Sequence, residues 1–129
     1  MMENQREKRS GLERRKYPRL SIPVLIHFSI GKESLERICV AKNIGAGGIC
    51  LIVPEEIPTQ TILALRINMP EEKDPIQAKG KVVWSQGISY GPGKIVYYNS
   101  AGIEFTEIAD SDRQRISKFV SDHVDKNQT

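Results

Sequence analysis

Between residues 21 and 108 the chain alternates apolar and polar positions in short runs that turn residues separate. The first run is apolar at every second position: Ile22, Val24, Ile26 and Phe28. A period of two is typical of a half-buried β-strand, because successive side chains point to opposite faces. Similar or continuous apolar runs predict further strands over 37–43, 48–53, 62–67 and 76–84.

Turn residues separate these predicted strands. A turn is expected at IGKES (30–34), a hairpin with a glycine-rich connection at NIGAGG (43–48) and a charged turn at PEEKDP (70–75). The polar segment SQGISYGPGK (85–94) is predicted to bridge to IVYYN and AGIEF, as one strand or as two with a bulge over 99–102. Several short strands spaced by turns favour a sandwich or a barrel.

The C-terminal segment changes to a helical period. From Asp110 onward, apolar residues recur at spacings of three and four, namely Ile116, Phe119, Val120 and Val124. This spacing predicts an amphipathic helix. SDRQ (111–114) fits a capping box at its start. A single helix of this length is marginal in water, so we expect its apolar stripe to dock on the barrel.

Composition limits the class of protein. The chain has 129 residues, 39% hydrophobic and 27% charged, which suits one globular domain with a modest core. No apolar stretch approaches the ~20 residues that cross a bilayer, so we expect a cytoplasmic protein. In that reducing compartment Cys39 and Cys50 are expected to be thiols, and their spacing does not suit a metal site.

The charge is unevenly distributed. The net charge is +3, yet residues 1–19 carry seven cations against three anions, so the rest of the chain is slightly negative. A basic arm on a near-neutral body is typical of proteins that meet phosphate groups in nucleic acid, lipid or nucleotide. A solvated arm without a ligand is the alternative.

Residues with catalytic potential are few. The histidines are His27, inside a strand pattern, and His123, near a helix end, and neither has a Ser, Cys or carboxylate at a spacing known for nucleophilic catalysis. The acidic pairs at 55–56 and 71–72 flank prolines in predicted turns, where solvated charge is expected. The sequence therefore predicts a protein that is not an enzyme.

Two motifs remain, and together they resemble a known family. RKYPR has the form RxxxR, with Arg15 and Arg19 at its ends, and NIGAGG has the form NxGxxG, from Asn43 to Gly48. This combination resembles the PilZ domain family, whose signature is RxxxR followed by a [DN]xSxxG hairpin. GKVVWS and AGIEFTEIADSDRQRISKFV resemble the family's later strands and trailing helix, so the resemblance covers residues 13–122.

The resemblance implies a mainly β fold, a six-stranded antiparallel β-barrel with a C-terminal α-helix. It divides the chain into a basic arm (1–12), the barrel domain with its helix (13–124) and a tail (125–129). It also implies a bacterial receptor for cyclic di-GMP, without a cofactor or metal. The expected ligand-binding residues are Arg14, Arg15 and Arg19 in and beside the RxxxR motif and Asn43, Gly45 and Gly48 in the hairpin.

The chain departs from the family pattern at Gly45, where the family has serine. Losing that hydroxyl removes one possible hydrogen bond to the ligand. Two alternatives follow: a protein-interaction adaptor that no longer binds the nucleotide, or a nucleic-acid-binding barrel, which the scarcity of exposed aromatic residues beside Lys or Arg disfavours. A receptor without a visible output domain would pass its signal to a separate protein, for instance of a motility, secretion or polysaccharide system.

Overall fold

The computed structural model describes residues 19–32, 35–93 and 95–128. Arg14, Arg15 and the rest of the basic arm before Arg19 lie outside these residues. The described elements are β1 (Arg19–Leu20), β2 (Val24–Ile30), β3 (Arg37–Gly45), β4 (Gly48–Val53), β5 (Ile62–Asn68), β6 (Ile76–Tyr90), β7 (Ile95–Ile108) and α2 (Asp110–Gln128).

Strands β2 to β7 form an antiparallel sheet that closes on itself. The hydrogen-bonded order is β3-β2-β5-β6-β7-β4, and β4 pairs back with β3 to complete the barrel. The short β1 adds to the same edge of β3 that β2 occupies farther along, with Leu20 opposite Ile44. This confirms the expected fold, a six-stranded antiparallel barrel followed by one helix.

Inward-facing residues of all six strands fill the barrel. Alternate positions on β2, β3 and β5 are buried, as the period-two pattern predicted. Fully buried side chains include Ile26, Ile44, Leu51, Ile67 and Ile103. Because each strand contributes inward side chains to one shared core, the barrel interior is a packed core that no single strand could form alone.

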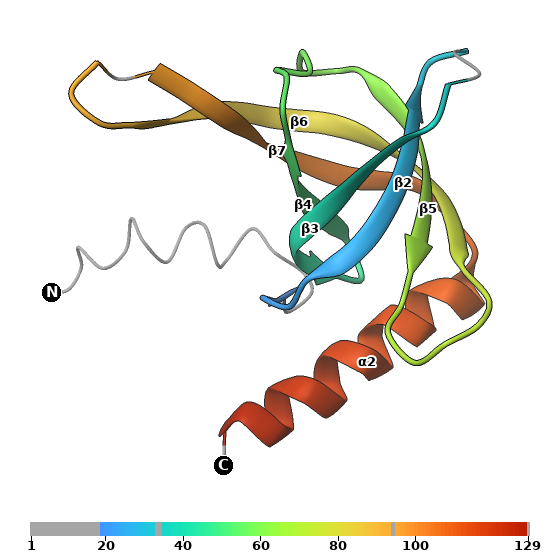
Figure 1. The fold of residues 1–129 in the computed structure, drawn as a ribbon. Helices are drawn as coiled ribbons and strands as arrows, with labels where there is room; N and C mark the ends of the chain where they lie inside the picture. Colours follow the sequence, from blue (N-terminus) through green and yellow to red (C-terminus); the bar gives the residue numbers. More distant parts are fainter. Residues whose placement is uncertain (1–18, 33–34, 94, 129) are drawn as a thin grey trace, which may run out of the picture.

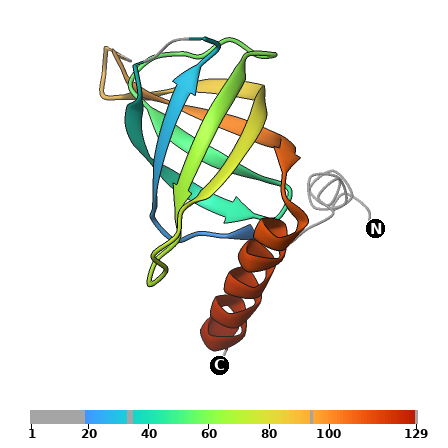
Figure 2. The same cartoon turned by 90° about the vertical axis from the view of Figure 1, so that its right-hand side faces the viewer.

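Helix α2 covers one end of the barrel and packs against β1 and β3 (Figure 2). The predicted stripe is confirmed for Ile116, Phe119 and Val120, which are all buried. Arg115 ties the helix to the β5–β6 loop, through an ion pair with Glu72 and a 2.6 Å hydrogen bond to the Asp74 carbonyl.

The predicted capping box at Ser111 is wrong. The helix begins at Asp110, and the Arg113 amide already donates a 2.9 Å hydrogen bond to the Ala109 carbonyl. Ser111 is therefore inside the first turn instead of preceding it. Asp110 and Asp112 supply negative charge in that turn, where the helix dipole favours it.

The predicted polar bridge over 85–94 is also wrong for most of its length. Strand β6 continues to Tyr90 and pairs with β7, which runs unbroken from Ile95 (Figure 1). The two strands extend as a hairpin beyond the barrel, where neither face needs apolar side chains. Backbone hydrogen bonds to β7 therefore keep this polar sequence in a strand. The strand could not be predicted from the spacing of apolar side chains.

We predict that Ile116→Ala lowers the free energy of unfolding by about 2–5 kcal/mol, because it leaves a cavity between α2 and the barrel. Ile62→Ala is the matched control, since Ile62 is 44% exposed and its loss should cost under about 1 kcal/mol. Urea denaturation measures both. Equal losses in the two variants would show that α2 does not contribute to the core.

Candidate functional site

Arg19 of the RxxxR motif and Asn43 of the NxGxxG motif meet on the outside of the barrel. Arg19 lies in β1 directly opposite Gly45 of β3, and its Nη1 donates a 2.8 Å hydrogen bond to the Asn43 Oδ1. Arg19, which precedes the first strand predicted from the sequence, therefore lies in a short strand of its own. Pairing with β3 fixes the backbone of Arg19, and this limits the positions that its guanidinium can reach.

A β-bulge presents Asn43 to the outer surface. The register between β3 and β4 shifts between Ala41 and Asn43, which makes Lys42 the extra residue. Ala41 and Ile44 are fully buried, whereas Lys42 is exposed and Asn43 half-buried. Two consecutive residues thus face outward between two inward ones, which simple alternation does not allow.

The glycines of the NxGxxG motif build a tight hairpin. Gly45 pairs with Gly48, and Ala46 and Gly47 form the turn. A Cβ on Gly48 would overlap the Ile103 carbonyl oxygen, and the Phe105 amide donates a 3.0 Å hydrogen bond to the Gly47 carbonyl. Gly48 is therefore required for the close approach of the hairpin to β7.

Helix α2 holds the tip of this hairpin. The Arg113 Nη1 donates a 2.8 Å hydrogen bond to the Ala46 carbonyl. Arg113 is not among the residues predicted from the sequence, because Arg113 and Ala46 are 67 positions apart and no local pattern connects them. The contact orients the hairpin relative to the helix that closes this end of the barrel.

A row of cross-strand neighbours extends the site across four strands. Asn43 of β3 lies opposite Cys50 of β4, Cys50 opposite Gly102 of β7, and Gly102 opposite Trp84 of β6. The Trp84 indole lies against Gly102, where a Cβ would overlap it, and the residue remains 43% exposed. Small residues therefore separate the Arg19–Asn43 pair from an exposed aromatic ring.

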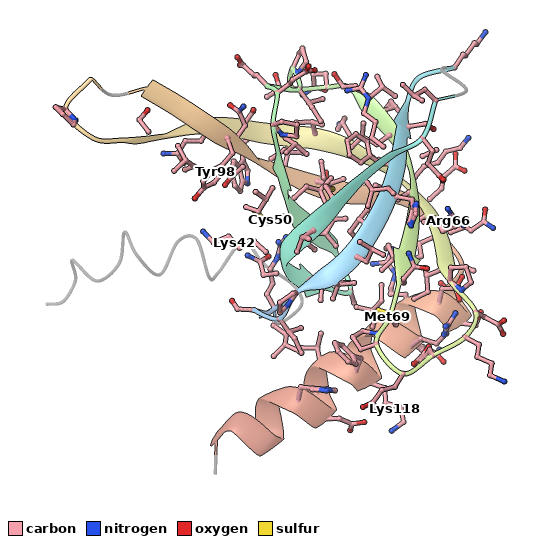
Figure 3. All side chains as sticks on the ribbon, viewed as in Figure 1. Lys42, Cys50, Arg66, Met69, Tyr98 and Lys118 are labelled. Carbon is pink, nitrogen blue, oxygen red and sulfur yellow. The ribbon has the colours of Figure 1, made fainter. Side chains whose placement is uncertain are left out.

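A bulge in β6 determines which way Trp84 points. Val82 is fully buried, so alternation alone would turn Trp84 inward. The register of β6 against β7 shifts between Val82 and Trp84, and this bulge at Val83 turns the indole outward. Tyr98 is half-buried farther along β7, and Figure 3 shows it beyond Lys42 and Cys50 on the same side of the barrel.

Positively charged side chains lie near this row and near the hairpin. Arg19, Lys42 and Arg113 supply positive charge and hydrogen-bond donors. His27 lies elsewhere, 3.4 Å from Glu36, and the His123 Nδ1 is 2.8 Å from the Phe119 carbonyl oxygen of its own helix. Within the described ranges no three His, Cys, Asp or Glu side chains gather as a metal site would require.

Both cysteines are free thiols, as expected from the sequence. The described part of the chain contains no helix with the length and apolar character needed to cross a membrane. Of the six expected ligand-binding residues, the structure brings Arg19, Asn43, Gly45 and Gly48 together around the hairpin. Arg14 and Arg15 lie outside the described residues.

Comparison with family models identifies a PilZ domain over residues 13–122. The comparison with curated proteins finds no match. Among solved structures, the chain resembles the Bacillus subtilis inhibitor of motility MotI/DgrA, with a TM-score of 0.75, 22% identity and coverage of 90% of this chain and 54% of that one.

Two further solved structures share the fold. The PilZ domain of Escherichia coli YcgR with c-di-GMP has a TM-score of 0.66 and 11% identity, and the match covers 89% of this chain and 95% of that one. The Borreliella burgdorferi PlzA protein in complex with c-di-GMP has a TM-score of 0.58 and 15% identity, with 98% and 59% covered. The chain thus spans only about half the length of MotI/DgrA and PlzA.

We predict that Gly48→Ala lowers the free energy of unfolding by about 3 kcal/mol or more, because its Cβ would meet a backbone carbonyl that cannot move aside. Gly102→Ala is the control: its Cβ meets the Trp84 side chain, which can rotate away at about 1 kcal/mol. Chemical denaturation gives the two losses, and tryptophan fluorescence should change only in Gly102→Ala. A mild loss in Gly48→Ala would contradict the close approach to β7.

Proposed function

The chain belongs to the PilZ domain family, and we propose that it is a non-catalytic receptor for cyclic di-GMP that binds the nucleotide beside the β3–β4 hairpin. The observation that supports this proposal is the contact between Arg19 and Asn43, at 2.8 Å. These residues come from the two halves of the family signature, which are 24 positions apart, and only the fold brings them together.

The chemistry of the residues suits this ligand. Cyclic di-GMP carries two phosphates and two guanines, and a guanidinium can fork onto phosphate oxygens, pair with guanine O6 and N7, or stack on a base. We assign Arg15 and Arg19 to these contacts, with Arg14 adding positive charge. Asn43 holds Arg19 in position and offers its amide group to the ligand.

The surface row extends the proposed site beyond the family signature. Cys50 and Gly102 are small residues between Asn43 and the exposed Trp84 indole in this row. An exposed aromatic ring in this position can stack on a base, and stacking contributes about 1–3 kcal/mol per base. We propose that Trp84 supports one guanine at the far end of the site.

The proposed mechanism is ordering of the basic arm. In this mechanism the negative charge of the nucleotide draws the segment before Arg19 onto the barrel and creates a new surface for a partner protein. Gly45 favours the alternative, an adaptor that has lost nucleotide binding, because the serine hydroxyl of the family pattern is missing there. Nucleotide titration separates these two functions.

We predict that Arg15→Ala and Arg19→Ala each weaken cyclic di-GMP binding by roughly ten- to a hundredfold, because each removes charge-assisted hydrogen bonds. Arg66→Ala, on β5, is the matched control and should bind like the unaltered chain. Calorimetric titration measures the affinities, with GTP and a single-stranded oligonucleotide as competing ligand classes. Quenching of the single tryptophan should follow the same titration.

Two results would contradict this proposal. Unchanged affinity in both arginine variants would exclude the arginine clamp. Binding of the oligonucleotide without binding of cyclic di-GMP would favour the nucleic-acid-binding alternative. Because β1 pairs with β3 through backbone groups, Arg19→Ala should remain folded, and a denaturation curve for each variant verifies this.

We predict that Gly45→Ser strengthens cyclic di-GMP binding by a few-fold to roughly a hundredfold, because the restored hydroxyl adds one hydrogen bond of about 0.5–3 kcal/mol. Backbone strain should not oppose it, since the described glycines with positive φ are Gly31 and Gly91. Calorimetry and a denaturation midpoint are measured together. A variant that is equally stable and binds no better would place the nucleotide away from the hairpin and favour the adaptor.

A further inference from the structure

Strands β3 and β4 separate at the end of the barrel that α2 does not cover. Their pairing runs from the hairpin to Val40 opposite Ile52 and stops there. Strand β3 continues back to Arg37 beside β2 alone, with Ile38 opposite His27 and Cys39 opposite Ile26. Among the described residues, Ile38 and Cys39 therefore have a neighbouring strand on one side only.

The separation has a visible cause at the end of β4. After Val53 comes Pro54, which has no amide proton to continue the ladder. The Asn99 Nδ2, from β7, donates a 3.3 Å hydrogen bond to the Pro54 carbonyl. The chain leaving β4 is thus held on the β7 side, away from β3.

A pocket of about 400 Å³ lies in the opening between the two strands. Its base consists of the inward side chains Phe28, Cys39, Val53 and Ile57, all buried. Burial raises the pKa of the Cys39 thiol to about 12, so the thiol is uncharged at physiological pH and the bottom of the pocket carries no charge. The floor of the pocket is therefore an apolar surface that is continuous with the barrel core.

The lip of the pocket carries the two most exposed large apolar residues of the described chain. Leu35 is 67% exposed and Ile38 is 64% exposed. Glu55 also lines the pocket, with its side chain 78% exposed, and the next residue in the chain, Glu56, is exposed as well. Arg37 lies 3.9 Å from Glu55, a surface ion pair that contributes little and can exchange for another cation.

We propose that this opening is a docking site for an extended peptide segment of a partner protein. The segment pairs as an added strand with β3 at Ile38 and Cys39, places one apolar side chain in the pocket, and sets a lysine or arginine beside Glu55 and Glu56. An open strand edge next to an apolar pocket is the arrangement by which added strands bind: the backbone supplies affinity and the pocket supplies specificity.

The site is distinct from the proposed nucleotide site and goes beyond it. Ile38 and Gly45 lie near opposite ends of β3, about 20 Å apart at ~3.3 Å per residue. A partner segment can therefore occupy the opening while the hairpin remains accessible. Peptide binding at the opening can be measured without nucleotide, so the result does not depend on whether the chain binds cyclic di-GMP.

The probe is a set of capped heptapeptides with Lys at both ends and Thr alternating with Val, Leu, Ile or Phe, titrated into the methyl-labelled protein. We expect members of the set to shift the Ile38, Val53 and Ile57 methyl signals and to leave that of Ile62 in place. Ile38→Glu should weaken this binding by about tenfold or more. Ile62→Glu, at an exposed isoleucine outside the pocket, should change it less than about twofold.

A second set with proline replacing the central Thr keeps the apolar side chains but cannot pair along a strand edge. It should bind about tenfold more weakly or not at all. Three results would overturn the proposal: no member shifts the pocket methyls, Ile38→Glu binds as well as the unaltered chain, or the proline set binds equally. Octanoate that displaces the peptides and binds more tightly would instead indicate a site for an acyl chain.

Discussion

The pairing of β3 with β4 closes the barrel, and both surface sites depend on how far that pairing extends. At the hairpin end it is continuous to Gly45 opposite Gly48, and the glycine at 48 brings the turn against the Ile103 carbonyl of β7. At the other end it stops at Val40. One strand pair therefore produces a tightly held hairpin at one end and an open, apolar gap at the other.

Two bulges decide which side chains reach the surface. The extra residue at Lys42 turns Asn43 outward to meet Arg19, and the extra residue at Val83 turns Trp84 outward over Gly102. Without either bulge, strict alternation would exchange inward and outward positions along the rest of its strand. Each bulge disrupts the backbone hydrogen bonds between its two strands locally. The many remaining strand pairs of the closed sheet keep the barrel together.

This dependence on bulges explains how much could be predicted from the sequence. Alternating apolar residues located most strands, and the three-and-four spacing of Ile116, Phe119 and Val120 located the buried stripe of the helix. Periodicity misses a bulge, because the extra residue is set by pairing with a distant strand. It also missed the polar half of β6, since backbone hydrogen bonds there need no apolar side chains.

The candidate site was predictable to a similar degree. A resemblance in two short motifs was enough to expect Arg19 and Asn43 in one place, and the structure brings them within 2.8 Å. Cys50 and Gly102 belong to no recognisable motif. They contribute to the candidate site only through their positions in the row between Asn43 and Trp84. These two residues matter because they are small and lie at particular positions in the sheet. A single sequence does not reveal which small residues have such positions.

Helix α2 connects the hairpin to a second part of the barrel. Arg113 binds the Ala46 carbonyl at the hairpin tip, and Arg115, two positions later, binds Glu72 and the Asp74 carbonyl in the β5–β6 loop. Ile116 and Val120 follow these two arginines in the helix and are buried, so the first turns of α2 cannot shift without breaking one of the arginine contacts or exposing apolar side chains. The hairpin tip is therefore fixed on two sides, by Arg113 of the helix and by the hydrogen bond from the Phe105 amide of β7 to the Gly47 carbonyl, and the helix in turn is bonded to the β5–β6 loop.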